Sequence, residues 1–432
     1  MAVKTPQGFV VDVPRGTRDF GPNEAMHLKY LMHGIEEAFK RHGFAPLITP
    51  AIENTETLGA KAYGEEPTKE MYLMDGKDTA LRFDFTVPLA RFMAMNKDIP
   101  FPFKRYQIDK VWRRDEPQRL RSREFMQADV DIIGSSDVAA DAECISTTMD
   151  ALASAGVKNC LILVNSRPLL ELVLTHFKVA KEKLGPAMRI IDKMEKVGIS
   201  ETANQLKAIG MQDDQAQIML SFIKEQISNE DKLKKTELEI ENSKAEVDKV
   251  RSLLGMLENF RVQDEIHLDL SLARGLDYYT GFVWEVIIQT AEGRLPTIAA
   301  GGRYDNLIGM YSKSATPAVG SSIGISRVFD ILYSGNGPKT YAKVFIAQVG
   351  SFNLEYCIEA ASKMRSAGIY VDMGLTEKGI SKQLEYANAA GIPYVAIIGA
   401  KEKAEGKLKL KNMSDGTEEL LDIDGAIAAL KK

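Results

Sequence analysis

Two strand-like runs joined by a charged loop stand out in the first third of this 432-residue chain. The runs FKRYQIDKVWRRDEP and REFMQADVDIIG are rich in aromatic and β-branched residues, and DEPQ between them is a turn signal. We therefore predict two antiparallel strands with a charged connection inside residues 81–133. This pair constrains the fold more than any other segment.

The same hairpin concentrates positive charge. Residues 104–123 hold eight basic and three acidic residues, in a chain whose net charge is −5. Because strand side chains alternate between faces, one face can combine an arginine, a ring, an amide and carboxylates. On the second strand these are Arg123, Phe125, Gln127, Asp129 and Asp131. Arginine forks suit phosphate oxygens and a flat ring suits a base, although a solvated basic hairpin explains the charge equally well.

The residue pattern in the rest of the chain predicts both helices and strands. Apolar spacing favours a helix over 23–42 and a short strand over 46–49, with further strands at 160–166 and 282–289. Residues 168–258 read as a helical insertion, whose Lys- and Glu-rich stretch 224–251 is typical of a solvated helix. TIAAGGRYDNLIG reads as a glycine-rich turn. After a linker at 334–339, alternating strands and helices predict a small α/β domain.

Several classes of protein are excluded or disfavoured. The apolar runs are too short for a membrane span, and MAVKTPQG lacks the apolar core of a signal peptide. Three scattered cysteines suit a reducing compartment, so we expect a cytoplasmic protein. Five histidines show no metal spacing, and we assign no metal ligands. GSSIG at 320–324 matches a nucleophile-elbow pattern, but no histidine follows Ser322 to complete a triad.

Taken together, the motifs resemble those of the class II aminoacyl-tRNA synthetases, and within that class the histidyl-tRNA synthetase family. PRGTRDF at 14–20 is similar to the family's N-terminal signature, and residues 23–50 to motif 1. KVWRRDEPQRLRSREFMQADVDIIG resembles motif 2 and GSSIGISRV resembles motif 3. RGLDYYTG and AAGGRYDNLIG resemble the two histidine-specific motifs. RGLDYYTG alone would be read as a hairpin turn.

The resemblance implies an α+β fold with an antiparallel class II sheet flanked by helices. It implies a catalytic domain in two parts (1–167 and 259–335), a helical insertion (168–258) and an anticodon-binding domain (340–432). Activity would be ATP-dependent ligation of L-histidine to tRNA(His), by way of a histidyl-adenylate and with Mg²⁺. A homodimer is implied by motif 1 alone.

The resemblance also implies residue roles. Arg113, Arg274 and Gln127 would be catalytic. ATP would be held by Arg113, Asp115, Arg121, Phe125 and Arg327. Histidine would be held by Asp84, Thr86, Gln127, Asp131, Arg274, Tyr279 and Tyr304, and Gln118 would touch the tRNA.

Two departures from the family pattern bear on this assignment. Glu116 stands in a loop that often reads Arg-Pro-Gln, and Asp84 and Asp131 stand where many members carry glutamate. The chief alternative function is a synthetase-like regulatory subunit that binds histidine without charging tRNA. Such subunits usually lose ATP-site arginines and the anticodon domain, both of which this chain retains. Another class IIa synthetase is disfavoured by the two histidine-specific motifs.

Overall fold

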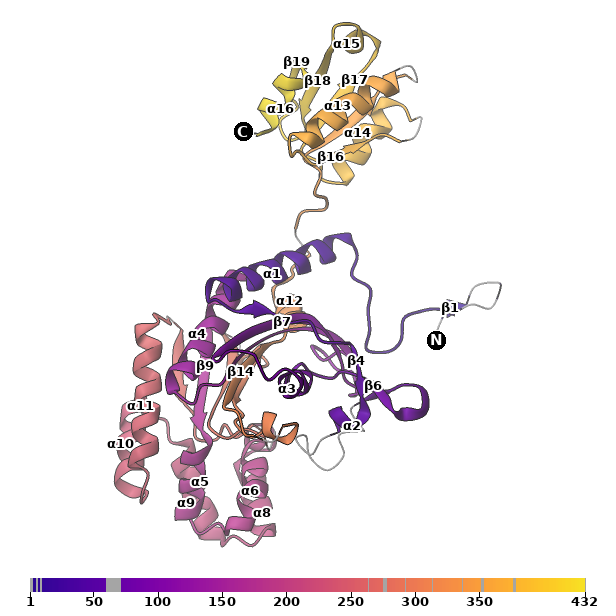
Figure 1. Cartoon of the computed structure of the whole chain (residues 1–432). Coiled ribbons are helices and arrows are strands. Elements are labelled where there is room, and N and C mark those ends of the chain that lie inside the picture. Colours follow the sequence, from indigo (N-terminus) through magenta and orange to yellow (C-terminus); the bar gives the residue numbers. More distant parts are fainter. Residues whose placement is uncertain are drawn as a thin grey trace. The chain divides into compact units, whose positions relative to one another are not determined.

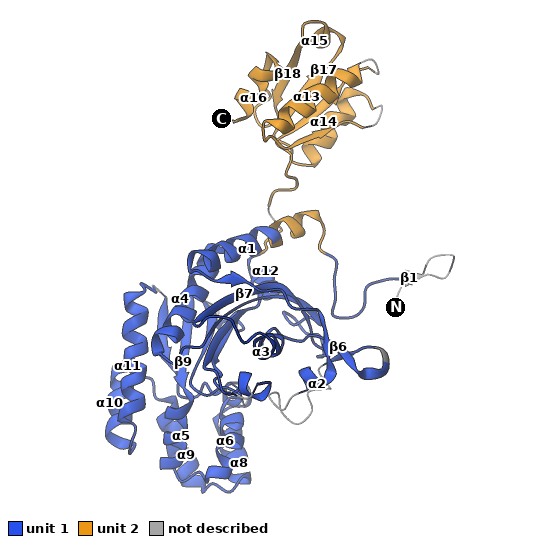
Figure 2. Ribbon diagram, in the orientation of Figure 1, with its two compact units in different colours: residues 1–19, 29–332 blue, residues 20–28, 333–432 orange. Residues whose placement is uncertain are grey.

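The computed structural model describes residues 3–4, 7, 10–59, 71–262, 264–274, 278–291, 293–312, 314–335, 337–350, 353–375 and 378–431. The chain divides into two compact units (Figure 2). The first comprises Met1–Asp19 and Lys29–Leu332, and the second comprises Phe20–Leu28 and Tyr333–Lys432. Each unit is described by itself.

A large curved sheet forms the centre of the first unit (Figure 1). Its strand order is β10-β9-β11-β13-β14-β8-β7-β3, with β12 paired to β11. Neighbours are antiparallel, except that β9 with β10 and β3 with β7 are parallel. The strands are β3 (Ala45–Pro46), β7 (Phe103–Trp112), β8 (Glu124–Ile133), β9 (Cys160–Ser166), β10 (Glu265–Leu268), β11 (Phe282–Thr290), β12 (Gly293–Arg294), β13 (Ala299–Arg303) and β14 (Ala318–Ile323).

Helices cover the two faces of this sheet differently. On one face, Phe39 of α1 packs its ring 5.6 Å from that of Tyr106, and α4 lies against β8 and β14. On the other face α3 lies within the curve of the sheet (Figure 1). The helices around the sheet, on either face, are α1 (Pro22–Arg41), α2 (Thr55–Leu58), α3 (Thr86–Met95), α4 (Val138–Ser154) and α12 (Ile325–Leu332), with 3₁₀ turns at Asp75–Lys77 and Ile308–Met310.

Local sequence explains α1. Its buried residues Leu31, Ile35, Ala38 and Phe39 recur at helical spacing and face the sheet. Gly43 follows the helix with a φ of 75°, the left-handed conformation that favours glycine at a helix end. The helix predicted over 23–42 is therefore confirmed to within one residue at either end.

A small separate sheet and a two-stranded pair complete the strands of this unit. The small sheet has the order β4-β6-β5, and β1 pairs with β2. Their bounds are β1 (Val3–Lys4), β2 (Val10–Val11), β4 (Ile52–Asn54), β5 (Tyr72–Leu73) and β6 (Thr79–Leu81).

The region predicted as a helical insertion consists of helices joined by short connections, and none of residues 168–258 lies in a strand. It holds α5 (Arg167–His176), α6 (Leu184–Ile191), α7 (Met194–Val197), α8 (Ile199–Ala208), α9 (Asp213–Lys224), α10 (Asn229–Glu239) and α11 (Lys244–Asn259), with a 3₁₀ turn at Lys181–Lys183. The Lys- and Glu-rich stretch contains the whole of α10 and the first half of α11. Arg251 pairs there with Glu230 and Glu237 at 3.2 and 2.9 Å, as expected for a solvated helical surface.

Two predictions about local structure were wrong. The strand predicted over 46–49 is reduced to β3, although the main chain of Leu47 still donates to the Tyr106 carbonyl at 2.8 Å. The run LRFDFTVPLARF at 81–92 has the texture of a strand, but its second half forms the start of α3. The glycine-rich segment near 299–303 is strand β13 and not a turn. Its glycines serve close packing, since a β-carbon on Gly301 would lie 2.5 Å from the Trp284 ring.

The second unit is an α/β domain with its own core. Its sheet has the order β16-β15-β17-β18-β19, parallel over the first three strands and antiparallel afterwards. The elements are β15 (Val344–Gln348), α13 (Leu354–Ser366), β16 (Val371–Met373), α14 (Ile380–Ala389), β17 (Tyr394–Ile398), α15 (Ala400–Ala404), β18 (Lys407–Asn412), β19 (Glu418–Asp422) and α16 (Ile423–Lys431). Of these, β19 and α15 were not predicted. None of the described helices has the length and apolar character needed to cross a membrane.

Candidate functional site

A cavity of about 420 Å³ lies on the face of the large sheet opposite α1 and α4. Its floor is β8, whose alternate residues Phe125, Gln127, Asp129 and Asp131 all line the cavity. The alternation predicted from sequence is therefore confirmed. Strand β7 flanks β8 on one side and β14 on the other, so residues from segments nearly 200 positions apart meet here.

The structure brings together almost every candidate residue. The predicted residues that line the cavity are Asp84, Thr86, Arg113, Asp115, Arg121, Phe125, Gln127, Asp131, Arg274, Tyr279, Tyr304 and Arg327. Gln118 is not among the lining residues. It lies in the β7–β8 loop, where its main chain exchanges hydrogen bonds with Arg121 at 3.0 and 2.9 Å.

Arginines gather at one end of the cavity. The guanidinium of Arg113 lies 5.3 Å from the centroid of the Phe125 ring, and its Nε donates to the Phe83 carbonyl at 3.1 Å. Arg121 pairs with Asp115 at 2.7 Å. Arg327 donates from Nη1 to the Thr297 carbonyl.

The electrostatics of this end favour an anion. Burial lowers the pKa of Arg327, and the positive charges of Arg121 and Arg113 lower it further. Part of this lowering of the Arg327 pKa is therefore repulsion between its charge and those of the two neighbouring arginines. A ligand with several negative oxygens would relieve that repulsion, and planar guanidinium groups suit phosphate oxygens.

The opposite end of the floor holds a buried ion pair. Arg105 of β7 lies opposite Asp131 of β8, and their side chains approach to 2.5 Å with 0 and 5% of their surfaces exposed. The Tyr304 hydroxyl donates to the other oxygen of Asp131. Burial raises the pKa of Asp131, while Arg105 and then Tyr304 lower it. Arg105 and Tyr304 therefore hold the Asp131 carboxylate, a hydrogen-bond acceptor, in a fixed position at the base of the cavity.

Aromatic hydroxyls line the wall above this acceptor. The rings of Tyr278 and Tyr279 contact each other at a tilt of 44°, with centroids 4.5 Å apart, and the Tyr278 hydroxyl lies 3.4 Å from that of Tyr279. The Tyr279 ring packs directly against the main chain of Gly302, since a β-carbon on this glycine would lie 2.6 Å from the ring. These residues supply polar atoms on rigid apolar bodies, which is suited to reading a small heteroaromatic ring.

Arg274 lies next to this wall in an unusual backbone conformation. Its φ is 46°, and its guanidinium lies 5.5 Å from the centroid of the Tyr279 ring. Its Nε is 3.8 Å from Glu285, and its buried Nη1 has no hydrogen-bond partner among the described residues. Asp277, which belongs to the same RGLDYYTG motif, lies outside the described residues. A strained residue with an unpaired donor facing a cavity is typical of a functional site.

Sequence reasoning missed three contributors to the floor. Gln127 donates from Nε2 to the Ser322 hydroxyl at 2.7 Å, so the serine of GSSIG is a strand residue that orients an amide. Arg105 was counted only as part of a basic run. Asp129 was placed on the correct face without a role. The available signal for Arg105 was its cross-strand position opposite an acidic residue, which depends on the register of the hairpin.

The N-terminal PRGTRDF segment braces the β7–β8 loop. The carbonyl of Gly16 accepts from the main chain of Arg123 at 2.8 Å. A β-carbon on Gly16 would lie 2.8 Å from both Arg123 and Pro117, and its φ is 85°. Arg15 pairs with Glu116 at 2.6 Å, with both side chains largely exposed. The acidic residue that departs from the family pattern thus has a partner within the chain.

Comparison with protein families assigns both parts of the chain. A family profile described as histidyl-tRNA synthetase matches residues 16–328, and one described as anticodon binding domain matches residues 343–432. A histidine–tRNA ligase from Aeropyrum pernix is 37% identical over 437 residues, covering 97% of each chain. One from Phocaeicola vulgatus is 33% identical and covers 97% of this chain and 98% of its own.

Solved structures agree with this assignment. The crystal structure of histidyl-tRNA synthetase from a Nostoc species has a TM-score of 0.86 and 29% identity, covering 98% of this chain and 99% of its own. A Bacillus halodurans structure titled as an ATP phosphoribosyltransferase regulatory subunit/histidyl-tRNA synthetase has a TM-score of 0.76 at 22% identity, covering 91% of this chain and 99% of its own. That second likeness shows the fold alone.

Proposed function

The chain belongs to the histidyl-tRNA synthetase family, and we propose that the cavity above β8 is where it joins histidine to ATP before transfer to tRNA(His). The observation that carries this proposal is the polarity of the cavity. Arginines gather at one end, and a buried carboxylate with tyrosines lies at the other. A nucleotide and an amino acid with a heteroaromatic ring fit these two ends.

ATP occupies the arginine end in this proposal. Phe125 and Arg327 enclose the adenine, while Arg113 binds the α-phosphate and Arg121 the γ-phosphate. Asp115 orients Arg121 through its ion pair. The support is the clustering of these side chains around one cavity and the effect of Arg113 and Arg121 on the pKa of Arg327.

Histidine occupies the other end. Asp131 and Tyr279 read the two imidazole nitrogens, with Tyr304 holding Asp131 in place. Asp84, Thr86 and Gln127 receive the α-amino group. An apolar side chain would leave the buried carboxylate and hydroxyls without partners, which costs enough to give strong selectivity without an editing site.

The chemistry requires no nucleophile from the protein. The histidine carboxylate attacks the α-phosphorus of ATP and pyrophosphate leaves; then the 3′-terminal hydroxyl of the tRNA attacks the adenylate. Arg113 and Arg274 stabilise the charge that develops at the α-phosphate, and Gln127 fixes the amino acid in line. The unpaired Nη1 of Arg274 supports this role.

Mg²⁺ is compatible with the groups at the ATP end. Among the described residues, no group of three or more His, Cys, Asp or Glu side chains is arranged so that it could hold a metal ion by itself. Mg²⁺ bound to a nucleotide needs only one or two carboxylates besides the phosphates. Glu285 would hold the ion, because its carboxylate lines the cavity. The Thr297 hydroxyl donates to this carboxylate at 2.7 Å. When bound, Mg²⁺ would neutralise charge on the phosphates.

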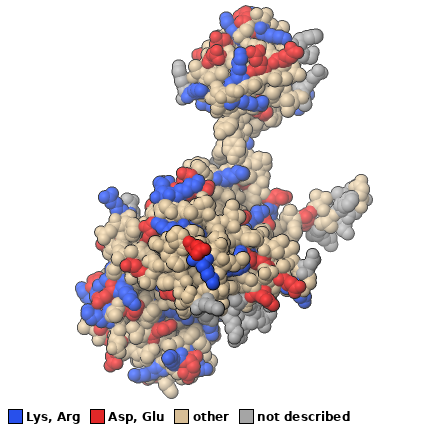
Figure 3. Space-filling view, viewed as in Figure 1, with Lys and Arg blue, Asp and Glu red and all other residues tan. Residues whose placement is uncertain are grey.

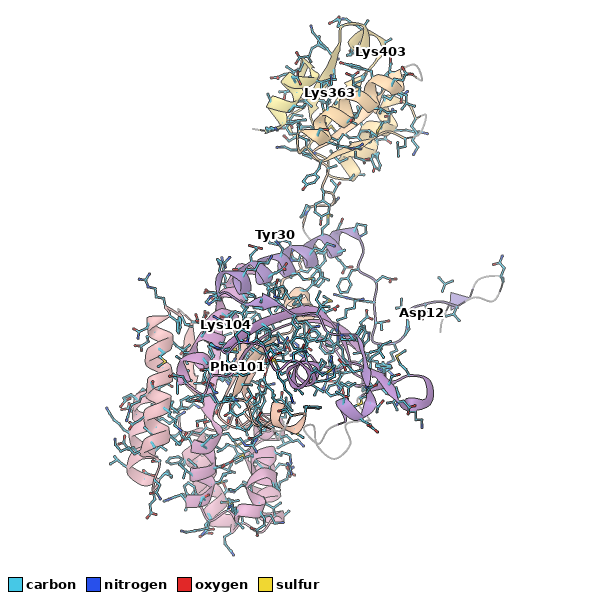
Figure 4. The ribbon with its side chains drawn as sticks, viewed as in Figure 1. Asp12, Tyr30, Phe101, Lys104, Lys363 and Lys403 are labelled. Atoms are coloured by element: carbon cyan, nitrogen blue, oxygen red, sulfur yellow. The ribbon has the colours of Figure 1, made fainter. Side chains whose placement is uncertain are left out.

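The same proposal covers three further features, namely the contacts with tRNA, the homodimer and the domain borders. Gln118 touches the acceptor end of the tRNA, and the domain at 340–432 reads the anticodon. The catalytic domain spans 1–167 and 259–335 and the insertion 168–258. A cytoplasmic homodimer forms through residues 23–50. Exposed apolar side chains there support the dimer, since Tyr30 on α1 is 69% exposed (Figure 4) and Ile48 is 85% exposed.

Aminoacylation with the full-length chain tests the proposal against its rival. We expect radiolabelled histidine to become attached to tRNA(His) in a reaction that needs ATP. A regulatory subunit would bind histidine and leave the tRNA uncharged. Histidine binding without charging, by a folded preparation supplied with ATP and Mg²⁺, would therefore favour the regulatory function.

A further inference from the structure

One acidic side chain of the cavity floor has no role in the function proposed above. Asp129 lies on β8 between Gln127 and Asp131 and lines the same cavity, with 5% of its surface exposed. Because residues two apart on a strand are about 6.6 Å apart, Asp129 is close to both neighbours. Its partner positions are Ser322 on β14 and Gln107 on β7.

The protein only partly satisfies this carboxylate. The Ser322 hydroxyl forms a hydrogen bond with it, but its Oδ1 is buried and has no partner among the described residues. The amide of Gln107 is bonded to Thr49 at 3.1 Å. The nearby cation, Arg105, makes its ion pair with Asp131. A buried oxygen without a donor is costly, and at a cavity wall it marks a place for a ligand donor.

The charges around Asp129 favour a cationic ligand. Its pKa is raised to about 7, chiefly by burial; the charge of Arg105 opposes this rise, and the charges of Asp131 and Asp84 add to it. The carboxylate is therefore poised between its neutral and ionised forms. A positive group placed against it would favour ionisation and would gain a charge-assisted hydrogen bond.

We propose that Asp129 binds the α-ammonium group of histidine, with Ser322 orienting both Asp129 and Gln127 toward it. This proposal rests on the function proposed above. The amino acid lies along β8, with its ring at Asp131 and its α-carbon toward Gln127. Asp129, between Gln127 and Asp131 on the strand, faces the part of histidine between its ring and its α-carbon. Histidine offers two kinds of donor there, the ammonium group and a ring nitrogen, and Asp131 already serves the ring.

Three ligands separate the two kinds of donor. L-Histidine and L-histidinol both carry the amine and the imidazole, whereas 3-(imidazol-4-yl)propionate lacks only the amine. We would measure their dissociation constants by calorimetry with the full-length protein and with Asp129→Asn. The variant should weaken histidine and histidinol by about tenfold to a hundredfold and imidazolylpropionate by less than about twofold.

Equal weakening of all three ligands would overturn the proposal, because it would mean a ring contact or a damaged cavity. Unchanged affinities would overturn it as well. Ser322→Ala is the second variant, and it should also weaken the two amine-bearing ligands selectively if Asp129→Asn does not fold. Histidine-dependent pyrophosphate exchange by the unmodified protein is measured separately. If exchange is present and the ligand pattern fails, only the role of Asp129 is wrong.

Discussion

Gly320 and Asp131 lie opposite each other on β14 and β8, and a β-carbon on Gly320 would lie 1.9 Å from Oδ1 of Asp131. The acceptor at the base of the cavity therefore occupies the space that a side chain would take. The absence of a side chain at Gly320 makes room for the carboxylate at this end of the cavity.

Gly320→Ala should damage histidine binding specifically. The added methyl group must displace the Asp131 carboxylate or the adjacent strand, and loss of one charged contact costs about 2 kcal/mol, some thirtyfold in affinity. Gly324→Ala is the matched control, because its β-carbon would meet the Ile298 carbonyl at an ordinary 3.5 Å. Michaelis constants for histidine in pyrophosphate exchange would test this. Similar constants for both variants would contradict it.

Arg274→Ala should slow adenylate formation far more than it weakens ATP binding. In our proposal its guanidinium stabilises charge that develops in the transition state, and loss of such a donor costs about 3 kcal/mol, a hundredfold or more in rate. Arg274→Lys keeps the positive charge but loses the planar set of guanidinium donors, so its rate of adenylate formation should lie between those of Arg274→Ala and the parent. An exchange rate for Arg274→Ala within about threefold of the parent would remove Arg274 from the mechanism.

Deletion of residues 340–432 should spare adenylate formation and impair tRNA charging. The buried core of this domain is made by its own residues, including Val344, Met364, Ile398 and Leu430. The domain holds nearly equal numbers of basic and acidic residues, and Figure 3 shows both signs mixed on its surface. Bulk charge therefore does not explain anticodon binding, and we expect base contacts and stacking.

The control for this deletion is a tRNA with an altered anticodon. That change should weaken charging by the full-length protein and leave the truncated protein unaffected. A folded truncation that still discriminates between anticodons, or one that has lost pyrophosphate exchange, would show that the two activities are not separable in this way.

A pH-dependent contact outside the cavity joins the end of α1 to α4. His42 Nε2 lies 2.7 Å from Asp150, and its Nδ1 lies 3.4 Å from Glu143. Lys104 of β7, labelled in Figure 4, pairs with Glu143 at 2.6 Å. Hydrogen bonding to Glu143 raises the pKa of His42 above its ordinary 6.5, and burial opposes this; the pKa of Glu143 is lowered to about 2.

The sign of the resulting stability change follows from linkage. A histidine whose folded pKa is raised stabilises the fold fully below its unfolded pKa, and this contribution is lost as pH rises through the folded pKa. His42→Gln should therefore lower the urea midpoint more at pH 6 than at pH 9. The difference should be about 1 kcal/mol or less, because Lys104 competes for Glu143. An equal loss at both pH values would contradict a charged His42.

The sequence was sufficient for features that depend on local alternation. The period of two placed Phe125, Gln127 and Asp131 on one face of β8, and the structure agrees. It was insufficient where the position of a residue depends on pairing between distant strands. The Gln127–Ser322 bond crosses 195 residues of sequence, and its serine was considered only as a nucleophile to be rejected.

Glycine-rich segments were misread for a related reason. Gly301 and Gly302 were taken as a turn, because glycine commonly supplies positive φ. Neither has a positive φ in β13; each makes room for a ring, Trp284 or Tyr279, to lie against the strand. Local sequence does not distinguish a glycine needed for backbone freedom from one needed for close packing.

Pyrophosphate exchange with each of the twenty amino acids tests the central claim most directly. One end of the cavity is lined by arginines and the other holds the buried Asp131 carboxylate, which in our proposal accepts a hydrogen bond from the imidazole of histidine. We predict that radiolabelled pyrophosphate enters ATP in the presence of histidine and with no other amino acid above background. Exchange driven better by another amino acid, or by none in a folded preparation, would contradict the account.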